Sequence, residues 1–338
     1  MDGAGLIRRL SSGPARVCGL VAGGLGLVVA LTAAVPPSGA QHGAAPHNRS
    51  TALGNFLTSV SAVSASDAWA VGNAPGLALH WNGTRWVRTA IPHSSSLSAL
   101  NGVSALSASD AWAVGALGDV STTTLALHWN GTAWARVPTP SPGRFTDLTS
   151  VSAASPADAW AVGVNPALAL RWNGMAWTQV AVPHPPGSSL LGVSTLSPTD
   201  AWAVGNYTAG KDIKTLVLRW NGTAWARVAS PSPGRSPLND SLSGVSVLSA
   251  SDAWAVGASG RGHTPFSPQK TLVLHWNGTR WTQVPAPSPR GTGTSPFTVL
   301  TGVSARSPSD AWAVGCACTN DFDTTLVLHW NGTAWARS

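Results

Sequence analysis

The chain has 338 residues, of which only 10% are charged, and it contains 18 Trp beside a single Tyr. Its apolar content of 43% excludes a disordered chain, and the complete absence of Glu argues against a helical protein. The formal charge of +7 is spread along the sequence instead of forming a basic run, so nucleic acid is not an expected partner.

The N-terminus reads as an export signal. Arg8 and Arg9 precede an apolar run at 17–35, and small residues at 38–40 follow it. This layout predicts a secretory signal peptide at residues 1–40, and the alternative is an uncleaved membrane anchor. After cleavage we expect no membrane association and a secreted, extracellular protein.

Residues 41–56 are expected to form a short flexible segment, and residues 57–338 repeat one pattern six times. The pattern is L-x-x-V-S-x-x-S-x-x-D-A-W-A-V-G, a variable gap, and then L-x-L-[HR]-W-N-G-T-x-W. Copies start near residues 57, 100, 148, 190, 242 and 300. The repeated Asp residues are Asp67, Asp110, Asp158, Asp200, Asp252 and Asp310. The Trp residues that follow them are Trp69, Trp112, Trp160, Trp202, Trp254 and Trp312.

Each copy carries four short segments with the alternation and the β-branched or aromatic residues typical of half-buried strands. In the first copy they read "LTSVSA", "DAWAVG", "LALHW" and "TRWVRT". The Asn82-Gly83 pair predicts a two-residue type I′ hairpin that places Leu79 opposite Trp86. Four antiparallel strands per repeat indicate a blade of a β-propeller.

The same register predicts one bulky and one small face in every copy, with Leu79, Trp81 and Trp86 on the bulky face. Large faces set against small neighbouring faces pack densely when the copies follow one another around a ring. The predicted fold is therefore all-β: a closed six-bladed β-propeller of four-stranded antiparallel blades.

The repeated residues are expected to be structural. We interpret the Trp residues as blade core, with sugar stacking as the alternative for Trp81 and its copies. Each repeated Asp is expected to accept hydrogen bonds from nearby backbone N–H groups, with a calcium ligand as the alternative.

A series of His residues stands beside the hairpins, and in two copies Arg replaces it. The series is His80, His128, His275 and His329, with Arg171 and Arg219 in the third and fourth copies. A polar residue beside a turn explains it better than a metal ring, so no metal and no cofactor are expected.

Loop lengths distinguish the two ends of the predicted ring. The turns at one end are constant, whereas the gap after "AVG" varies from 4 to 14 residues. Binding residues concentrate on variable loops over a rigid scaffold. The candidate ligand-binding residues of the variable end are Arg144, Arg235, Arg290, His93 and His184. Such an Arg rim would bind carboxylate or sulfate groups; alternatively, "PSPGR" only stiffens the crossing.

Cys316 and Cys318 are the cysteines that remain after the predicted cleavage. In an oxidising compartment they are candidates for a disulfide. Free thiols, or a metal site shared with Asp321 and Asp323, remain open alternatives.

The "GTAW" hairpin resembles the Asp-box hairpins of bacterial sialidase-type propellers, although Trp81 stands where an Asp-box has Asp. "DAWAVG" followed by W-x-G-x-x-W resembles secreted bacterial propeller repeats. These are grouped with the photosystem assembly-factor-like proteins and with kelch and galactose-oxidase-type propellers. The resemblance covers residues 57–338 and implies the propeller fold.

The residue inventory argues against the chemistry of those families. Sialidase-type catalysis implies a Tyr–Glu pair and a galactose-oxidase-type copper site implies two Tyr, yet Tyr207 is the sole Tyr. The carboxylates outside the repeat position are Asp119, Asp147, Asp212, Asp240, Asp321 and Asp323.

We therefore expect a monomeric, noncatalytic extracellular binding or interaction propeller for carbohydrate, anionic cell-surface or protein ligands. One alternative is a polysaccharide-active enzyme, either a lyase or a hydrolase based on Asp212 or Asp240. A second alternative is a structural cell-envelope adhesion protein.

Overall fold

The structure, a computed structural model, describes residues 57–73, 76–92, 98–118, 121–234, 236–261, 269–289, 297–318 and 323–338. For Cys318 and Asp323 the description covers the backbone alone. Twenty-four β-strands make up the regular structure of these ranges. Within the same ranges, no helix has the length and apolarity needed to cross a bilayer.

The strands follow one another in groups of four, which are the blades. Blade 1 comprises β1 Leu57–Ser64, β2 Asp67–Gly72, β3 Leu77–Trp81 and β4 Trp86–Arg88. Blade 2 comprises β5 Ser98–Ser107, β6 Asp110–Leu117, β7 Thr123–Trp129 and β8 Trp134–Val137. Blade 3 comprises β9 Asp147–Ser155, β10 Asp158–Val164, β11 Leu168–Trp172 and β12 Trp177–Val180.

The second half of the chain repeats this order. Blade 4 comprises β13 Ser189–Ser197, β14 Asp200–Ala209, β15 Asp212–Trp220 and β16 Trp225–Arg227. Blade 5 comprises β17 Ser241–Ser249, β18 Asp252–Gly260, β19 Gln269–Trp276 and β20 Trp281–Gln283. Blade 6 comprises β21 Phe297–Ser307, β22 Asp310–Cys318, β23 Asp323–Trp330 and β24 Trp335–Arg337.

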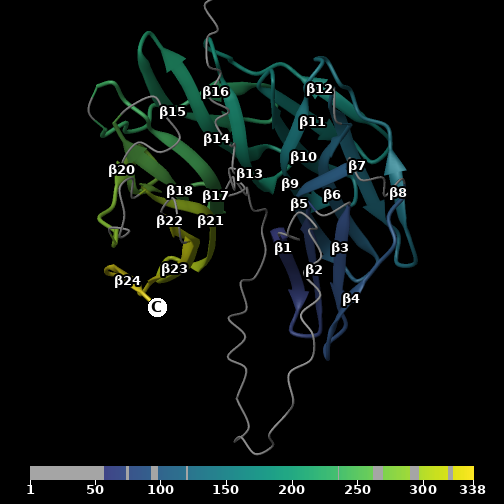
Figure 1. The fold of residues 1–338 in the computed structure, drawn as a ribbon. Coiled ribbons are helices and arrows are strands. Elements are labelled where there is room, and N and C mark those ends of the chain that lie inside the picture. Colours follow the sequence, from purple (N-terminus) through teal and green to yellow (C-terminus); the bar gives the residue numbers. More distant parts are fainter. Residues whose placement is uncertain are drawn as a thin grey trace, which may run out of the picture.

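Within each blade the strands pair antiparallel in chain order, and a single parallel pair, Gln269 with Phe297, links blade 5 to blade 6. The blades succeed one another around a common centre, where the first strands of neighbouring blades lie against each other (Figure 1). The predicted all-β propeller of four-stranded antiparallel blades is confirmed.

The hairpin between the third and fourth strands differs from the predicted two-residue turn. Trp81 pairs directly with Trp86, so the loop holds four residues. The Asn82 carboxamide oxygen accepts the N–H groups of Thr84 and Arg85 at 3.1 and 3.0 Å. Only Gly83 takes a positive φ, 90°, whereas a type I′ turn requires two such residues. The side chain of Asn therefore caps the loop, which places the two indoles opposite each other.

The predicted division into one bulky and one small face is also wrong. Trp69 pairs with His80 and Val71 with Ala78, while Ala70 pairs with Leu79. Each face therefore combines large residues of one strand with small residues of the next. We call the face with Trp69, Val71 and Ala78 the forward face, because it meets the following blade. The face with Leu79 and Trp86 is the rear face.

Five hydrophobic clusters form the core of the described residues, and each joins the forward face of one blade to the rear face of the next. In every cluster a forward-face Trp contacts two rear-face indoles. One indole is tilted, with ring centroids 4.8 to 5.0 Å apart, and the other is edge-on at 4.8 to 5.2 Å. Most of the 18 Trp are thus consumed in packing between blades.

The Ser of the repeated Val-Ser forms a hydrogen bond across each of these interfaces. The Ser61 hydroxyl oxygen accepts the backbone N–H of Ala105 in the next blade at 3.0 Å. Equivalent bonds cross the other four interfaces at 3.0 to 3.1 Å. The first strand of a blade has an unpaired edge, and these hydroxyls satisfy its N–H groups.

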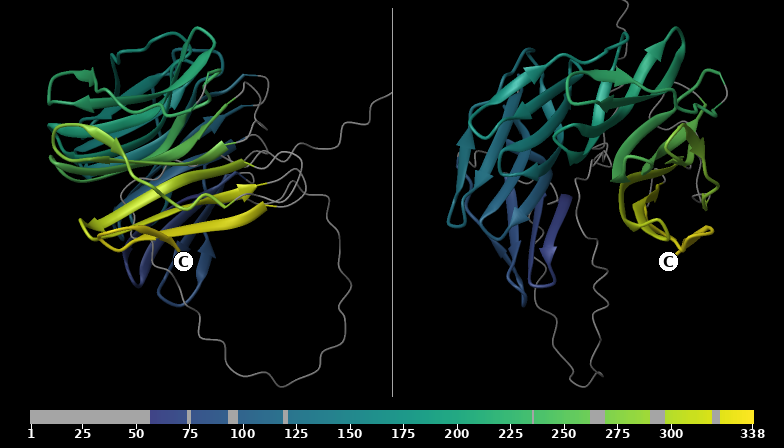
Figure 2. Two further views of the ribbon diagram at one scale, coloured as in Figure 1. Left: turned by 90° about the vertical axis from the view of Figure 1, so that its left-hand side faces the viewer. Right: turned by 180° about the vertical axis from the view of Figure 1, so that it is seen from behind.

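The expectation of a closed ring is not met by the described residues. None of the five clusters and none of the described aromatic contacts joins blade 6 to blade 1. Figures 1 and 2 show the same arrangement: β1–β4 in purple and β21–β24 in yellow stand apart at the two ends of an arc. The repeat specifies how two neighbouring blades pack, but the number of blades needed to close a ring depends on the angle between neighbours.

Candidate functional site

One end of the propeller carries the turns that hardly vary between blades, and we call it the constant mouth. In all six blades the last Trp of the third strand donates its indole N–H to a carbonyl of the turn between the first two strands, at 2.9 to 3.1 Å. The turn and the hairpin loop are thereby held together in the same way each time, so this mouth presents six near-identical units.

The repeated Asp and the His or Arg series meet at this mouth, which the sequence analysis did not foresee. Asp67 lies 2.8 Å from Nε2 of His80, and Arg219 contacts both carboxylate oxygens of Asp200 at 3.0 and 2.7 Å. The remaining pairs are Asp110–His128, Asp158–Arg171, Asp252–His275 and Asp310–His329. Arg can replace His in blades 3 and 4 because both side chains can donate to a carboxylate from the same strand position.

These Asp–His and Asp–Arg pairs lie over the forward-face indoles. The His80 ring stacks on Trp69 with centroids 4.4 Å apart, and the Arg219 guanidinium lies 4.9 Å from the Trp202 ring centre. The network is therefore part of the blade structure. No group of three or more His, Cys, Asp or Glu suited to a metal occurs in the described part of the chain.

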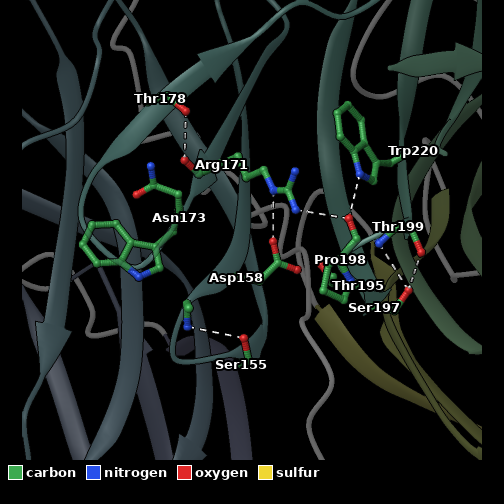
Figure 3. A network of polar contacts seen from close by, with 12 residues as sticks. Ser155, Asp158, Arg171, Asn173, Thr178, Thr195, Ser197, Pro198, Thr199 and Trp220 are labelled. Atoms are coloured by element: carbon green, nitrogen blue, oxygen red, sulfur yellow. Dashed lines mark hydrogen bonds and ion pairs between the residues drawn. The ribbon is translucent and has the colours of Figure 1, made fainter. Parts of the chain in front are cut away.

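The two Arg copies add a bond that His cannot reach (Figure 3). The Arg171 Nη2 donates to the carbonyl of Pro198 in the next blade at 3.1 Å, and the indole of Trp220 donates to the same oxygen at 3.0 Å. Arg219 and Trp276 share the Ala250 carbonyl in the same way, at 3.3 and 3.1 Å. Blades 3, 4 and 5 are thereby linked at the constant mouth.

The opposite end, the variable mouth, contains the gaps after the second strand and the linkers between blades. A bridge between Thr122 and Phe145 and a contact of Leu238 with Arg261 show that neighbouring loops touch here. The Ser of "PSPGR", Ser141, accepts the backbone N–H of Thr124 at 3.3 Å. Ser232 and Ser288 bind Thr215 and Thr271 likewise. The Pro-Ser-Pro motif therefore ties the linker to the third strand of its own blade.

Two of the five candidate binding residues lie in the described part of this mouth. Arg144 is exposed in the linker between blades 2 and 3, with its guanidinium 5.8 Å from the ring centre of Phe145, itself 50% exposed. His184 is exposed in the linker between blades 3 and 4. Arg235, Arg290 and His93 lie outside the described residues. The structure gives no contact between Arg144 and His184, and the Arg rim remains a prediction.

Asp212 and Asp240, the carboxylates considered for an enzyme, also lie at the variable mouth. Asp240 is completely buried, and its oxygens accept the N–H groups of Gly234 and Gly260 at 3.0 and 3.1 Å. Asp212 accepts the N–H of Leu238 at 3.0 Å and the Ser236 hydroxyl at 2.9 Å. Both carboxylates fasten the linker between blades 4 and 5. Of the remaining carboxylates outside the repeat position, Asp119 and Asp321 lie outside the described residues.

Burial raises the pKa of Asp240 above its usual value of about 3.8, and hydrogen bonding to Leu238 lowers the pKa of Asp212. Because the native state holds the Asp240 proton more tightly than the unfolded chain, its contribution to stability is full below pH 3.8 and decreases as pH rises through the raised pKa. The free energy of unfolding of the wild type, relative to that of Asp240→Asn, should therefore decrease as pH rises from 3.8 through the raised pKa of Asp240. Above that pKa the difference between the two proteins should stay constant. Urea unfolding from pH 3 to pH 7 measures the difference, and a wild type that gains on the variant as pH rises would contradict this.

Cys316 is disulfide-bonded and nearly buried, 7% exposed. The side chain of Cys318 lies outside the description, so the pairing of these two residues stays a prediction. Among the described residues, the sequence analysis missed the Asp–His and Asp–Arg pairing. The signal was available in the repeat, since a constant Asp faces a position that only ever carries His or Arg.

No family model and no curated protein matches the chain. Solved structures match it as a fold. YCF48 bound to a D1 peptide is 17% identical, with a TM-score of 0.53, over 84% of this chain and 80% of that one. A GH74 xyloglucanase from Xanthomonas campestris is 15% identical, with a TM-score of 0.56, over 84% of this chain but only 45% of the enzyme. An ulvan lyase of family PL25 is 8% identical, with a TM-score of 0.54, over 82% of this chain and 81% of the lyase. At these identities the likeness shows a β-propeller and no particular activity.

Proposed function

We propose that the chain is an exported, noncatalytic binding propeller that presents its ligand site on the variable mouth. The observation that carries this proposal is the separation of the two ends: six near-identical hairpin units at the constant mouth, and individual loops at the other. A rigid scaffold with one set of variable loops is the usual arrangement of a binding surface. Export rests on residues 1–40, which lie outside the described residues.

The charge of the variable mouth favours an anionic ligand. All three lysines of the chain stand near this mouth: Lys211 lies in the turn between β14 and β15, Lys214 near the start of β15 and Lys270 near the start of β19. Arg144 and Arg261 are exposed at the same end. The nearby Asp212 and Asp240 oxygens are engaged with backbone N–H groups. Carboxylated or sulfated glycans are therefore the ligand class we propose, because guanidinium and ammonium groups bind such anions well.

Two described carboxylates of this mouth, those of Asp212 and Asp240, support binding without catalysis. Glycoside hydrolysis requires a pair of carboxyl groups that both reach the substrate. Asp240 is buried and its oxygens accept backbone N–H groups, while Asp212 holds the linker. The solved neighbours include a peptide-bound protein and two polysaccharide-active enzymes by their printed names, so the test must separate binding from turnover.

The test applies the purified protein to an array of neutral, carboxylated and sulfated polysaccharides, and assays each bound polymer for new reducing or unsaturated ends. We expect binding to the acidic polymers without new ends. Arg144→Ala should weaken binding about tenfold, the effect of losing one charged hydrogen bond. The matched control is Arg280→Ala, because Arg280 is an exposed arginine in the hairpin loop of the constant mouth. New chain ends would establish an enzyme instead, and equal loss in both Arg variants would remove the variable mouth as the site.

A further inference from the structure

In the described ranges, the rear face of blade 1 packs against no other blade, whereas the rear faces of blades 2 to 6 each pack against the preceding blade. On blade 1, Leu57 is 55% exposed, Val60 43% and Trp86 38%. The residues equivalent to Leu57 are fully buried: Leu100, Leu148, Leu190, Leu242 and Leu300. The residues equivalent to Trp86 are 4 to 5% exposed: Trp134, Trp177, Trp225, Trp281 and Trp335. The exposed face of blade 1 is thus one half of the interface that the chain builds five times.

The arc ends with the complementary half. On blade 6, Trp312, Val314 and Val327 are partly exposed, whereas the forward-face Trp residues of the other five blades are 0 to 1% exposed. Trp312 keeps its intrablade stack on His329, at 4.3 Å, but in the described residues no neighbouring indole lies against it.

The backbone spacing between blades also indicates an uncovered forward face on blade 6, independently of the indole contacts. A Cβ added at Gly244 would lie 3.2 Å from Cα of Gly302 in the next blade, and one at Gly102 would lie 3.1 Å from Cα of Ser150. Among the described residues, a Cβ added at Gly302 would meet Val314 of its own blade and no other residue. In the described part of the chain, no neighbouring strand therefore lies in front of blade 6, whereas the other five blades each have one.

Five equivalent interfaces also determine the angle at which the blades turn. The indole distances vary by no more than 0.4 Å among them, so each blade is rotated against its neighbour in nearly the same way. After five such rotations blade 6 has not reached blade 1 (Figure 2). Direct closure would require all five close-packed interfaces to change together, which packed cores resist.

We propose that the two open faces form a docking site for one further blade of the same repeat, supplied by a partner polypeptide. Such a partner presents a rear face with a Leu and a Trp pair to Trp312, and a forward face with a single Trp to Trp81 and Trp86. Its required size is one four-stranded unit like blade 2, residues 98–137. Burying both large apolar faces at once is the driving force.

A second copy of this chain does not satisfy both faces. Its blade 1 can stack its free rear face on blade 6 of the first copy. The forward face of that same blade is already covered by its own blade 2, as the cluster of Trp69 with Trp129 and Trp134 shows. The rear face of blade 1 in the first copy then stays open. Only an independent blade has both faces available.

The experiment adds a peptide with the sequence of residues 98–137 to the full chain and measures binding by isothermal titration calorimetry, with mass by light scattering. We expect one peptide per chain and a monomeric protein without peptide. Trp86→Arg and Trp312→Arg should each weaken binding at least 30-fold, roughly, as for central indoles of an interface. Met175→Arg is the matched control, because Met175 is 84% exposed in a hairpin loop away from both faces, and it should bind normally.

A second measurement covers the case in which the peptide does not fold in solution. The same forty residues are fused after Ser338 through a copy of the linker 138–146, and the midpoint of thermal unfolding is compared with that of the unfused chain. We expect a rise of at least about 4 °C that Trp312→Arg abolishes. A dimer without peptide would assign the faces to a second copy. Binding only after removal of residues 1–56 would assign them to that segment. No binding together with no thermal gain in the fusion would refute the site.

Discussion

Trp69→Ala is expected to lower the free energy of unfolding by about 3–5 kcal/mol, whereas Trp312→Ala should cost roughly 1–2 kcal/mol. The two residues hold the same repeat position, each on a terminal blade, and each stacks on the His of its own blade at 4.4 and 4.3 Å. Trp69 in addition packs against Trp129 and Trp134 of blade 2, both 4.8 Å away, and is 0% exposed. Trp312 has no such neighbours among the described residues.

The pair therefore measures the interface between blades with the interactions inside the blade held constant. Urea unfolding followed by far-ultraviolet circular dichroism is the appropriate measurement, because changes in Trp fluorescence would mix the lost fluorophore with the lost structure. Equal losses for the two variants would mean that Trp312 is buried in solution, and the open arc would then be incorrect. The comparison depends on neither the proposed ligand nor the proposed partner blade.

The architecture within a blade could be predicted from the sequence because it depends on local patterns. Alternation of large and small residues, the Asn-Gly pairs and the sixfold repetition specify four antiparallel strands per copy. The strands observed from Leu57 to Arg337 follow that pattern. The local sequence pattern was sufficient to predict the strands of a blade because each strand pairs with its neighbour in the chain.

The hairpin register shows where local patterns mislead. Asn-Gly is the preferred pair for a two-residue turn, but here the Asn82 side chain accepts two backbone N–H groups and stabilises a four-residue loop. That one change puts Trp81 opposite Trp86. The Thr84 hydroxyl, which also binds the Asn82 oxygen at 2.8 Å, was the signal for the longer loop.

The Asp–His and Asp–Arg pairs at the constant mouth could not be predicted without the register of neighbouring strands. Asp67 and His80 are 13 residues apart, and their contact follows from the pairing of Trp69 with His80. The replacement of His by Arg in the third and fourth copies was visible in the sequence. The role of this position as the hydrogen-bond partner of Asp could not be predicted without the strand register.

Whether the blades close into a ring could not be predicted from the sequence. Each interface is specified by a pair of faces, but the number of blades in a closed circle depends on a small rotation per blade that arises from side-chain packing. The exposed fractions of Leu57 and Val60, 55% and 43%, reveal the open end directly. The composition of those positions is the same as in the closed interfaces, so no pattern distinguishes them.

Gly205→Ala should be the most damaging of the small substitutions, with a loss of at least about 3 kcal/mol of unfolding free energy, at the upper end of overpacking costs. A Cβ at Gly205 would lie 1.9 Å from the carbonyl oxygen of Ser189 on the paired strand, at the point where the register shifts between Leu190 and Gly192. Because the obstructing atom belongs to the backbone, a side-chain rotation cannot relieve the overlap. The two strands would have to separate, which opens the buried Trp202 to water.

The control for this prediction is Gly210→Ala. Gly210 has a φ of 64° and no heavy atom within 4 Å of the added Cβ, so only the left-handed conformation is penalised, at about 1 kcal/mol. Both variants are compared by urea unfolding under the same conditions. The final Gly of "DAWAVG" approaches the first strand equally closely in blades 2 and 6, where the added Cβ at Gly115 and Gly315 would be 1.9 Å from a carbonyl oxygen. A milder effect for Gly205→Ala than for Gly210→Ala would show that the bulge does not bring the strands as close as described, and the invariance of this glycine would then need another cause.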